Sequence, residues 1–163
     1  MSATGWGGGA TRARALEIMR DSRIGTFGAV GLILLIGLKW SALAALPPAL
    51  VPAVLIAVPP LSRGAAITLM AALPYARVDD SRARPFVSRP APARLLAIGV
   101  MAVTPLGLLP VSWWPALLVA AGTVGGLCAL WFRRHLGGYT GDRLGATQQL
   151  AELVILLTAV ACA

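Results

Sequence analysis

Long apolar runs separated by short basic segments constrain the fold of this chain more than any other feature. Hydrophobic residues make up 58% of the 163 positions and charged residues only 12%, a balance far from that of a soluble globular domain. A helix of about 20 apolar residues is long enough to cross the hydrocarbon of a bilayer. The pattern therefore predicts an all-α protein, a polytopic integral membrane helix bundle.

We expect one membrane domain over residues 1–163, in which a segment at 1–23 precedes about five spans. The second apolar stretch is interrupted by Pro59 and Pro60, and a proline inside a helix removes a backbone donor and clashes with the preceding turn. We therefore expect this stretch to be broken into a half-helix and a second helix. The spans are predicted at residues 24–46, 49–76, 95–109, 111–132 and 146–163.

The formal charge of +8 is distributed in a way that indicates membrane topology. Arginines gather before the first apolar run and in alternate connecting segments, whereas the short links near Pro47 and Pro110 carry no cation. Cytoplasmic loops of membrane proteins collect Lys and Arg in this manner. We therefore expect a multi-pass protein of the cell inner membrane with a cytoplasmic N-terminus and segment 1–23. We therefore expect the protein to interact with the lipid membrane and not with nucleic acid. Whether it forms a homo-oligomer is left open.

Two carboxylates stand just ahead of the first apolar run. Glu17 and Asp21 are four residues apart on a predicted short helix, so both face the same side. They could converge on a divalent cation. Alternatively, Glu17 pairs with Arg14 or Arg20 on a solvated face, and spacing alone leaves both interpretations open.

A glycine-rich segment at residues 135–146 lies between the last two apolar runs. Glycines allow close backbone approach, and backbone N–H groups collect anions, so such a segment suits a phosphate or a metal. Asp142, beside Thr140, is either a carboxylate that binds a metal or a hydroxyl, or a helix cap for the last span. Guanidinium groups bind phosphate oxygens and so suit an anionic substrate. The candidates are Arg20, Arg23, Arg77 and Arg143, although membrane topology alone would also explain arginines at these positions.

Glu152 lies inside the last apolar run, where an unpaired charge costs roughly 2.5–3.5 kcal/mol on insertion scales. It is expected to be protonated, to pair with Arg63 or Lys39, or to face a polar cavity. If one helix holds both Asp142 and Glu152, their carboxylates are about 15 Å apart and cannot share one ion. The sequence contains no Ser-His-Asp spacing, zinc pattern or Walker-type loop, so the predicted chemistry is Mg²⁺-assisted phosphoryl transfer.

Several polar segments, in order and with the apolar stretches between them, resemble the adenosylcobinamide-GDP ribazoletransferase family, also called cobalamin 5′-phosphate synthase. The most specific pieces are Met-Arg-Asp-Ser-Arg-Ile-Gly from residue 19 and Gly-Gly-Tyr-Thr-Gly-Asp from residue 137. The resemblance covers essentially the whole chain. Its matching segments are 5–9, 16–28, 73–77 and 136–146, followed by Gln149 and Glu152.

This resemblance implies a membrane transferase of cobalamin (vitamin B12) biosynthesis that requires Mg²⁺. In that reaction the ribose 3′-hydroxyl of α-ribazole, or of its 5′-phosphate, displaces GMP from adenosylcobinamide-GDP. The resemblance makes Asp21 and Asp142 the catalytic candidates; both are also metal-binding candidates, together with Glu17 because of its spacing to Asp21. The candidates for substrate binding are Arg20, Arg23, Arg77, Tyr139, Thr140 and Arg143.

The chain departs from the family pattern at its beginning. Family members carry an aspartate-rich stretch before the glycine run, where this chain has residues 1–4 without a carboxylate. We therefore expect a member that lacks the N-terminal part. Two alternatives stay open: a non-catalytic membrane remnant, and a small multi-pass transporter or channel subunit with a polar path marked by Lys39, Arg63 and Glu152.

Overall fold

A computed structural model describes residues 25–74, 91–136, 138–139 and 141–163 of the chain. Helices account for nearly all of these residues, and none of the described residues belongs to an extended strand. The elements are α2 (Thr26–Ala45), α3 (Val51–Ala72), α4 (Pro92–Val103), the 3₁₀ turns η2 (Thr104–Leu108) and η3 (Val111–Trp113), α5 (Trp114–Leu136) and α6 (Gly141–Cys162).

Four of the described helical segments are long and apolar enough to cross a membrane: Thr26–Ala45, Val51–Ala72, Val111–Arg134 and Gly141–Cys162. A shorter apolar segment, Pro92–Leu108, combines α4 with η2. The predicted all-α, polytopic membrane fold is confirmed, with four to five apolar helices.

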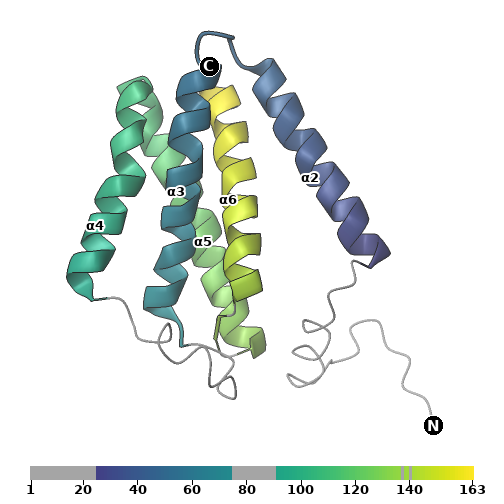
Figure 1. Cartoon of the computed structure of the whole chain (residues 1–163), viewed down its shortest axis with the longest axis vertical. Helices are drawn as coiled ribbons and strands as arrows, with labels where there is room; N and C mark the ends of the chain where they lie inside the picture. Colours follow the sequence, from purple (N-terminus) through teal and green to yellow (C-terminus); the bar gives the residue numbers. More distant parts are fainter. Residues whose placement is uncertain (1–24, 75–90, 137, 140) are drawn as a thin grey trace.

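Helix α3 is the centre of the bundle and packs against α4, α5 and α6 (Figure 1). Helix α2 contacts α6 near its C-terminal end and diverges from the bundle toward its N-terminal end (Figure 1). Within α2 only Ala42 is buried. Helix α2 therefore depends on few packing contacts for its position.

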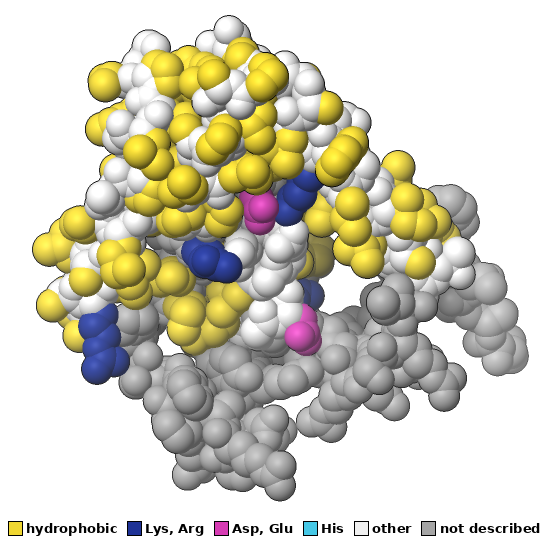
Figure 2. Space-filling model, turned by 45° about the horizontal axis from the view of Figure 1, so that its top comes forward, with side chains coloured by type: hydrophobic (Ala, Val, Ile, Leu, Met, Phe, Trp, Pro, Cys, Tyr) yellow, Lys and Arg dark blue, Asp and Glu magenta, His cyan; other side chains and the backbone are white. Residues whose placement is uncertain are grey.

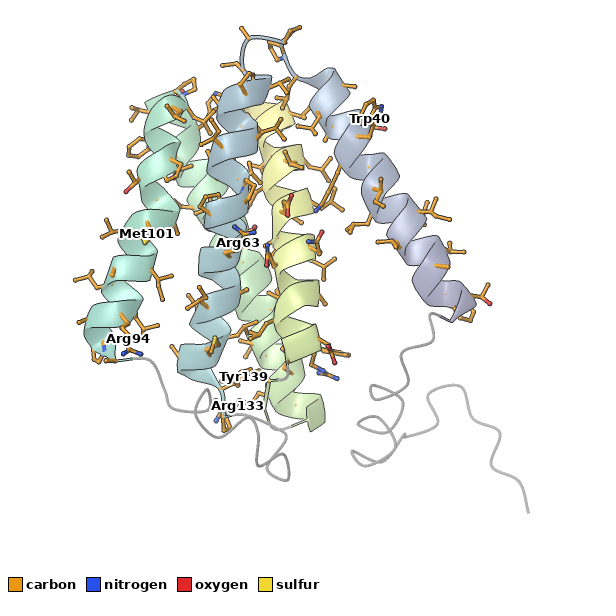
Figure 3. All side chains as sticks on the ribbon, viewed as in Figure 1. Trp40, Arg63, Arg94, Met101, Arg133 and Tyr139 are labelled. Carbon is orange, nitrogen blue, oxygen red and sulfur yellow. The ribbon has the colours of Figure 1, made fainter. Side chains whose placement is uncertain are left out.

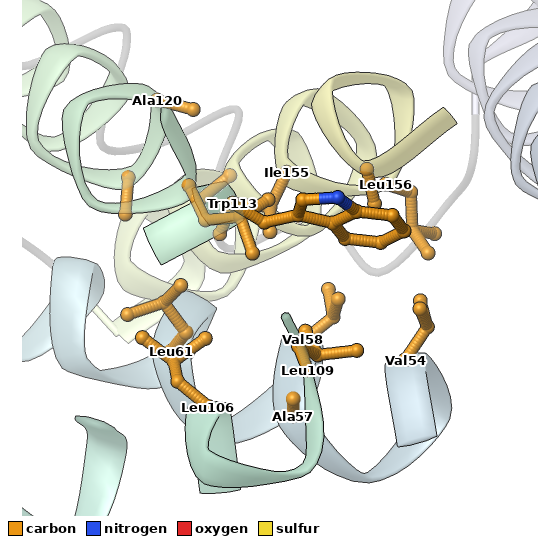
Figure 4. Close-up of a cluster of buried hydrophobic side chains, with 14 of the residues drawn as sticks. Val54, Ala57, Val58, Leu61, Leu106, Leu109, Trp113, Ala120, Ile155 and Leu156 are labelled. Atoms are coloured by element: carbon orange, nitrogen blue, oxygen red, sulfur yellow. The ribbon is translucent and has the colours of Figure 1, made fainter. Parts of the chain in front are cut away.

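The main core lies between α3, α5, α6 and the η2–η3 connection (Figure 4). Apolar side chains from these elements interdigitate there, which matters because lipid supplies no hydrophobic force between helices and close van der Waals contact must hold them together. Its most deeply buried members include Val54, Val58, Leu106, Leu117 and Ile155.

The expected break at Pro59 and Pro60 was wrong, because α3 is one continuous helix through both prolines. Neighbouring side chains on both sides of the prolines are buried against the bundle, so tertiary packing holds the turn in helical geometry. The Ser62 hydroxyl donates a hydrogen bond of 2.9 Å to the Pro59 carbonyl oxygen. Prolines are tolerated in membrane helices where packing against neighbouring helices holds the segment in helical geometry.

The last span was expected to begin at residue 146, but α6 begins at Gly141. The additional turn contains an acidic side chain, Asp142, which favours a helix N-terminus because of the partial positive charge there. Leu144 in the same turn packs against a small buried cluster at the end of α3. Asp142 and Arg143 are therefore helical residues and do not belong to a loop.

Close packing between α3 and α4 depends on Gly64. A Cβ atom at this position would lie 2.8 Å from the Cβ atom of Ala102. We expect Gly64→Ala to lower the free energy of unfolding by about 1–3 kcal/mol, because overpacking forces the two helices apart.

Denaturant unfolding in detergent micelles measures this effect. Gly99→Ala on α4 is the matched control, because a Cβ atom there meets nothing within 4 Å. An equal loss of stability in both variants would contradict the close approach of α3 and α4.

Candidate functional site

The helix ends that flank the undescribed segments all point toward the same end of the bundle, although the start of α2 lies apart from the others (Figure 1). These are the start of α2, the end of α3, the start of α4, the end of α5 and the start of α6 (Figure 1). The opposite end holds the short α2–α3 link, the η2–η3 connection and the C-terminus. All segments predicted to carry chemistry are thus attached to the same end.

Tyr139 ties the segment between α5 and α6 to the end of α3. Its backbone N–H donates a hydrogen bond of 3.0 Å to the carbonyl oxygen of Pro74. Its ring is buried in a small cluster with Leu69, Leu73 and Phe132. This packing positions the start of α6 relative to α3. Substrate binding by Tyr139 stays a prediction.

Arg143 lies against two aromatic rings at the end of α5. Its guanidinium carbon is 4.9 Å from the centroid of the Trp131 ring and 4.7 Å from that of Phe132. The two rings meet edge to face, with centroids 5.5 Å apart. Such stacking fixes the plane of a guanidinium group while its N–H donors remain in the plane for hydrogen bonding.

One nitrogen of Arg143, Nη1, is buried and has no hydrogen-bond partner in the described part of the chain. Buried donors are normally satisfied, so an unpaired one calls for an explanation. A phosphate oxygen is a suitable acceptor because arginine binds phosphate through parallel charge-assisted hydrogen bonds. The arrangement is thus chemically competent to hold an anion at the start of α6.

Asp142 precedes Arg143 in the first turn of α6 and is exposed. Glu152 lies ten residues further along the same helix, about 15 Å away, which confirms that the two carboxylates cannot share one ion. The described residues contain no group of three or more His, Cys, Asp or Glu side chains that could hold a metal. A Mg²⁺ ion needs only one or two protein carboxylates when substrate phosphates supply other ligands, and Asp142 fits that requirement.

The remaining predicted site residues lie outside the described residues. They are Glu17, Arg20, Asp21, Arg23, Arg77 and Thr140. Of the predicted set, the structure describes Tyr139, Asp142 and Arg143, at or next to the start of α6.

Glu152 pairs with Lys39 of α2, which was one of the alternatives predicted for it. The Lys39 Nζ atom is 3.2 Å from Glu152 Oε2. Lys39 also donates a hydrogen bond of 2.6 Å to Gln149 Oε1. The role of Gln149 was not anticipated, although its position three residues before Glu152 puts both on one face of a helix.

Sequence reasoning also missed the aromatic partners of Arg143. Phe132 was expected only as the last residue of the span at 111–132. No local signal links Trp131 and Phe132 to Arg143, because the contact joins two helices at their ends and depends on how α5 packs against α6. Figure 3 shows Arg133 and Tyr139 at this same end of the bundle.

Taken together, these features define a polytopic helical membrane protein that presents a stacked arginine and a carboxylate at one end of its bundle. The family model for cobalamin-5-phosphate synthase matches residues 2–160. The chain belongs to the cobalamin-5-phosphate synthase family.

Curated relatives agree with this family assignment. An adenosylcobinamide-GDP ribazoletransferase of Sinorhizobium medicae is 45% identical over 165 residues, which cover 95% of this chain and 62% of the relative. The enzyme of that name from Syntrophobacter fumaroxidans is 44% identical, with 98% and 64% covered. This chain therefore spans a little over three fifths of the length of these relatives. No solved structure matches the chain.

Proposed function

We propose that this chain acts as an adenosylcobinamide-GDP ribazoletransferase, which joins α-ribazole or α-ribazole 5′-phosphate to adenosylcobinamide-GDP and releases GMP. The observation that carries the proposal is Arg143, whose guanidinium is oriented by two aromatic rings at the end of the bundle where Asp142 also lies. Family membership supplies the reaction, and the arginine supplies a group suited to its diphosphate substrate.

In the proposed reaction the ribose 3′-hydroxyl oxygen attacks the phosphorus atom bonded to the cobinamide side. The new P–O bond forms while the P–O bond to GMP breaks, and the hydroxyl proton passes to a base. Arg143 would hold nonbridging oxygens of the diphosphate and oppose their negative charge in the transition state. A bound Mg²⁺ would neutralise further phosphate charge, with Asp142 and the predicted Glu17 and Asp21 as its carboxylate ligands.

We further propose that the chain lies in the cell inner membrane and that the end of the bundle carrying Arg143 faces the cytoplasm. Arg94 lies in the first turn of α4, and Arg133 and Arg134 lie in the last turn of α5. The described cations outside the mid-membrane region therefore gather at this end of the bundle. The positive-inside rule supports that orientation and a cytoplasmic N-terminus. The transporter alternative gains no support, because Lys39 and Glu152 form an ion pair with each other.

The proposal is tested with the purified chain in liposomes, supplied with adenosylcobinamide-GDP, α-ribazole and Mg²⁺. We expect Mg²⁺-dependent release of GMP, and we expect Asp21→Asn to lower the rate at least tenfold because a metal-binding carboxylate is lost. Asp80→Asn is the matched control and should leave the rate unchanged. Absence of GMP release, or equal rates for Asp21→Asn and the unmodified chain, would contradict the proposal.

A further inference from the structure

Arg63 places a positive charge on the outer surface of α3, about midway along the helix (Figure 3). Its side chain is exposed and has no ion pair or hydrogen bond within the described part of the chain. An apolar groove of about 420 Å³ between α3 and α4 lies beside it, lined among others by Ile67, Ile98 and Met101. Because arginine stays charged, acyl chains alone are a poor environment for this surface.

The depth of Arg63 argues against a lipid phosphate as its partner. Arg63 is nine residues before Ala72 at the end of α3, a distance of about 14 Å along the helix. Cations reach lipid headgroups by snorkelling when they lie near helix ends. Arg63 is too deep for that, which favours an acidic group within the membrane as its partner.

Glu152 is an acidic group at the matching depth. It lies eleven residues after Gly141, about 16 Å from the same end of the bundle. Its side chain retains 21% of its accessible surface, and Lys39 contacts only its Oε2 atom, which leaves Oε1 without a partner among the described residues. A carboxylate accepts several hydrogen bonds, so Glu152 can bind a second cation.

Charged side chains of both signs lie in the middle of one otherwise hydrophobic face (Figure 2). This face includes the α3 surface that carries Arg63. Consider a second copy of the chain that is rotated by a half-turn about the membrane normal and faces the first. Because the cation and the anion lie at equal depth, the cation of each copy can then lie opposite the anion of the other. This is the self-complementary arrangement of a two-fold dimer.

We propose that two copies of this chain pair through the α3–α6 face, with Arg63 of each copy bound to Glu152 of the partner subunit. Each Glu152 then bridges Lys39 of its own chain and the arginine of the other. The apolar groove between α3 and α4 receives apolar side chains of the second copy. This assembly is independent of the transferase proposal.

Cysteine cross-linking between copies tests the geometry. Ile67→Cys and Gln148→Cys each lie one helical turn from Arg63 and Glu152, on the same side. In chains with Cys128 and Cys162 replaced by alanine, co-expressed Ile67→Cys and Gln148→Cys copies should form an intermolecular disulfide. Leu130→Cys, exposed on α5 behind this face, is the matched control and should not cross-link with Gln148→Cys.

Subunit counting by single-molecule photobleaching in liposomes tests the charge pairing. We expect dimers at low protein-to-lipid ratio, and we expect Arg63→Leu to weaken dimerisation about tenfold and to suppress the disulfide. Arg94→Leu, which removes an exposed arginine at the start of α4, should leave both unchanged. Monomers throughout, absence of the disulfide, or a disulfide that persists in Arg63→Leu would overturn the proposal, whatever the transferase activity.

Discussion

Replacing Arg143 with methionine is expected to lower kcat/KM for GMP release by about 100- to 1000-fold. Preorganised donors aimed at charge that develops in the transition state have effects of this size when removed. Arg143 is preorganised because Trp131 and Phe132 hold its guanidinium plane. Methionine keeps an unbranched side chain against the rings while removing every N–H donor.

Two further variants distinguish the role of the Arg143 guanidinium from that of positive charge alone. Arg143→Lys keeps the positive charge but loses the planar fork, so we expect an intermediate rate. Arg134→Met removes an exposed arginine at the end of α5 and should change kcat/KM only slightly. Thermal unfolding of each variant shows whether the fold is intact. A full rate for Arg143→Met in a folded protein would remove Arg143 from the proposed site.

Breaking the ion pair between α2 and α6 is expected to have the largest effect on stability. Lys39→Met or Glu152→Leu alone should lower the free energy of unfolding by about 2–4 kcal/mol, because each leaves one charge unpaired inside the membrane. In chains that also carry Arg63→Leu, so that no arginine of a partner subunit is left without Glu152, the double variant removes both charges and should recover to within about 1 kcal/mol of Arg63→Leu alone.

Unfolding by steric trapping in bicelles measures all three variants and gives a double-mutant cycle. Lys39→Arg, which keeps the charge, serves as the control and should lose little stability. Additive losses in the double variant would show that Lys39 and Glu152 do not depend on each other, and would contradict the pairing at 3.2 Å.

Helix type and number were predictable because apolar length is a direct signal for crossing a membrane. The residues at which helices begin and end were less predictable, and α6 illustrates why. Residues 141–145 are polar and glycine-rich, which indicates a loop on composition alone. Their helical state depends on the acidic first turn, which can be read from the sequence. It also depends on Leu144 packing against the end of α3, which cannot be read from the sequence.

For Glu152 the sequence left open protonation, a polar cavity, and pairing with either of two cations, and it could not choose among them. Lys39 and Arg63 both lie inside apolar runs, and spacing gives no information on which helix α6 meets. At the candidate site at the start of α6, likewise, the sequence identified a residue but not its contacts. Arg143 was identified as an anion-binding candidate from its residue type, whereas its aromatic partners became apparent only from the packing of α5 on α6.

By itself, the amino-acid sequence determined that this chain is helical, crosses a membrane and resembles one family, because apolar length and local motifs are properties of contiguous residues. Tertiary structure alone decided that α3 continues through Pro59 and Pro60, that Glu152 binds Lys39, and that Arg63 faces outward. Each of these depends on contacts between helices distant in sequence. Those contacts compensate for lost backbone bonds and buried charges only once the helices have packed.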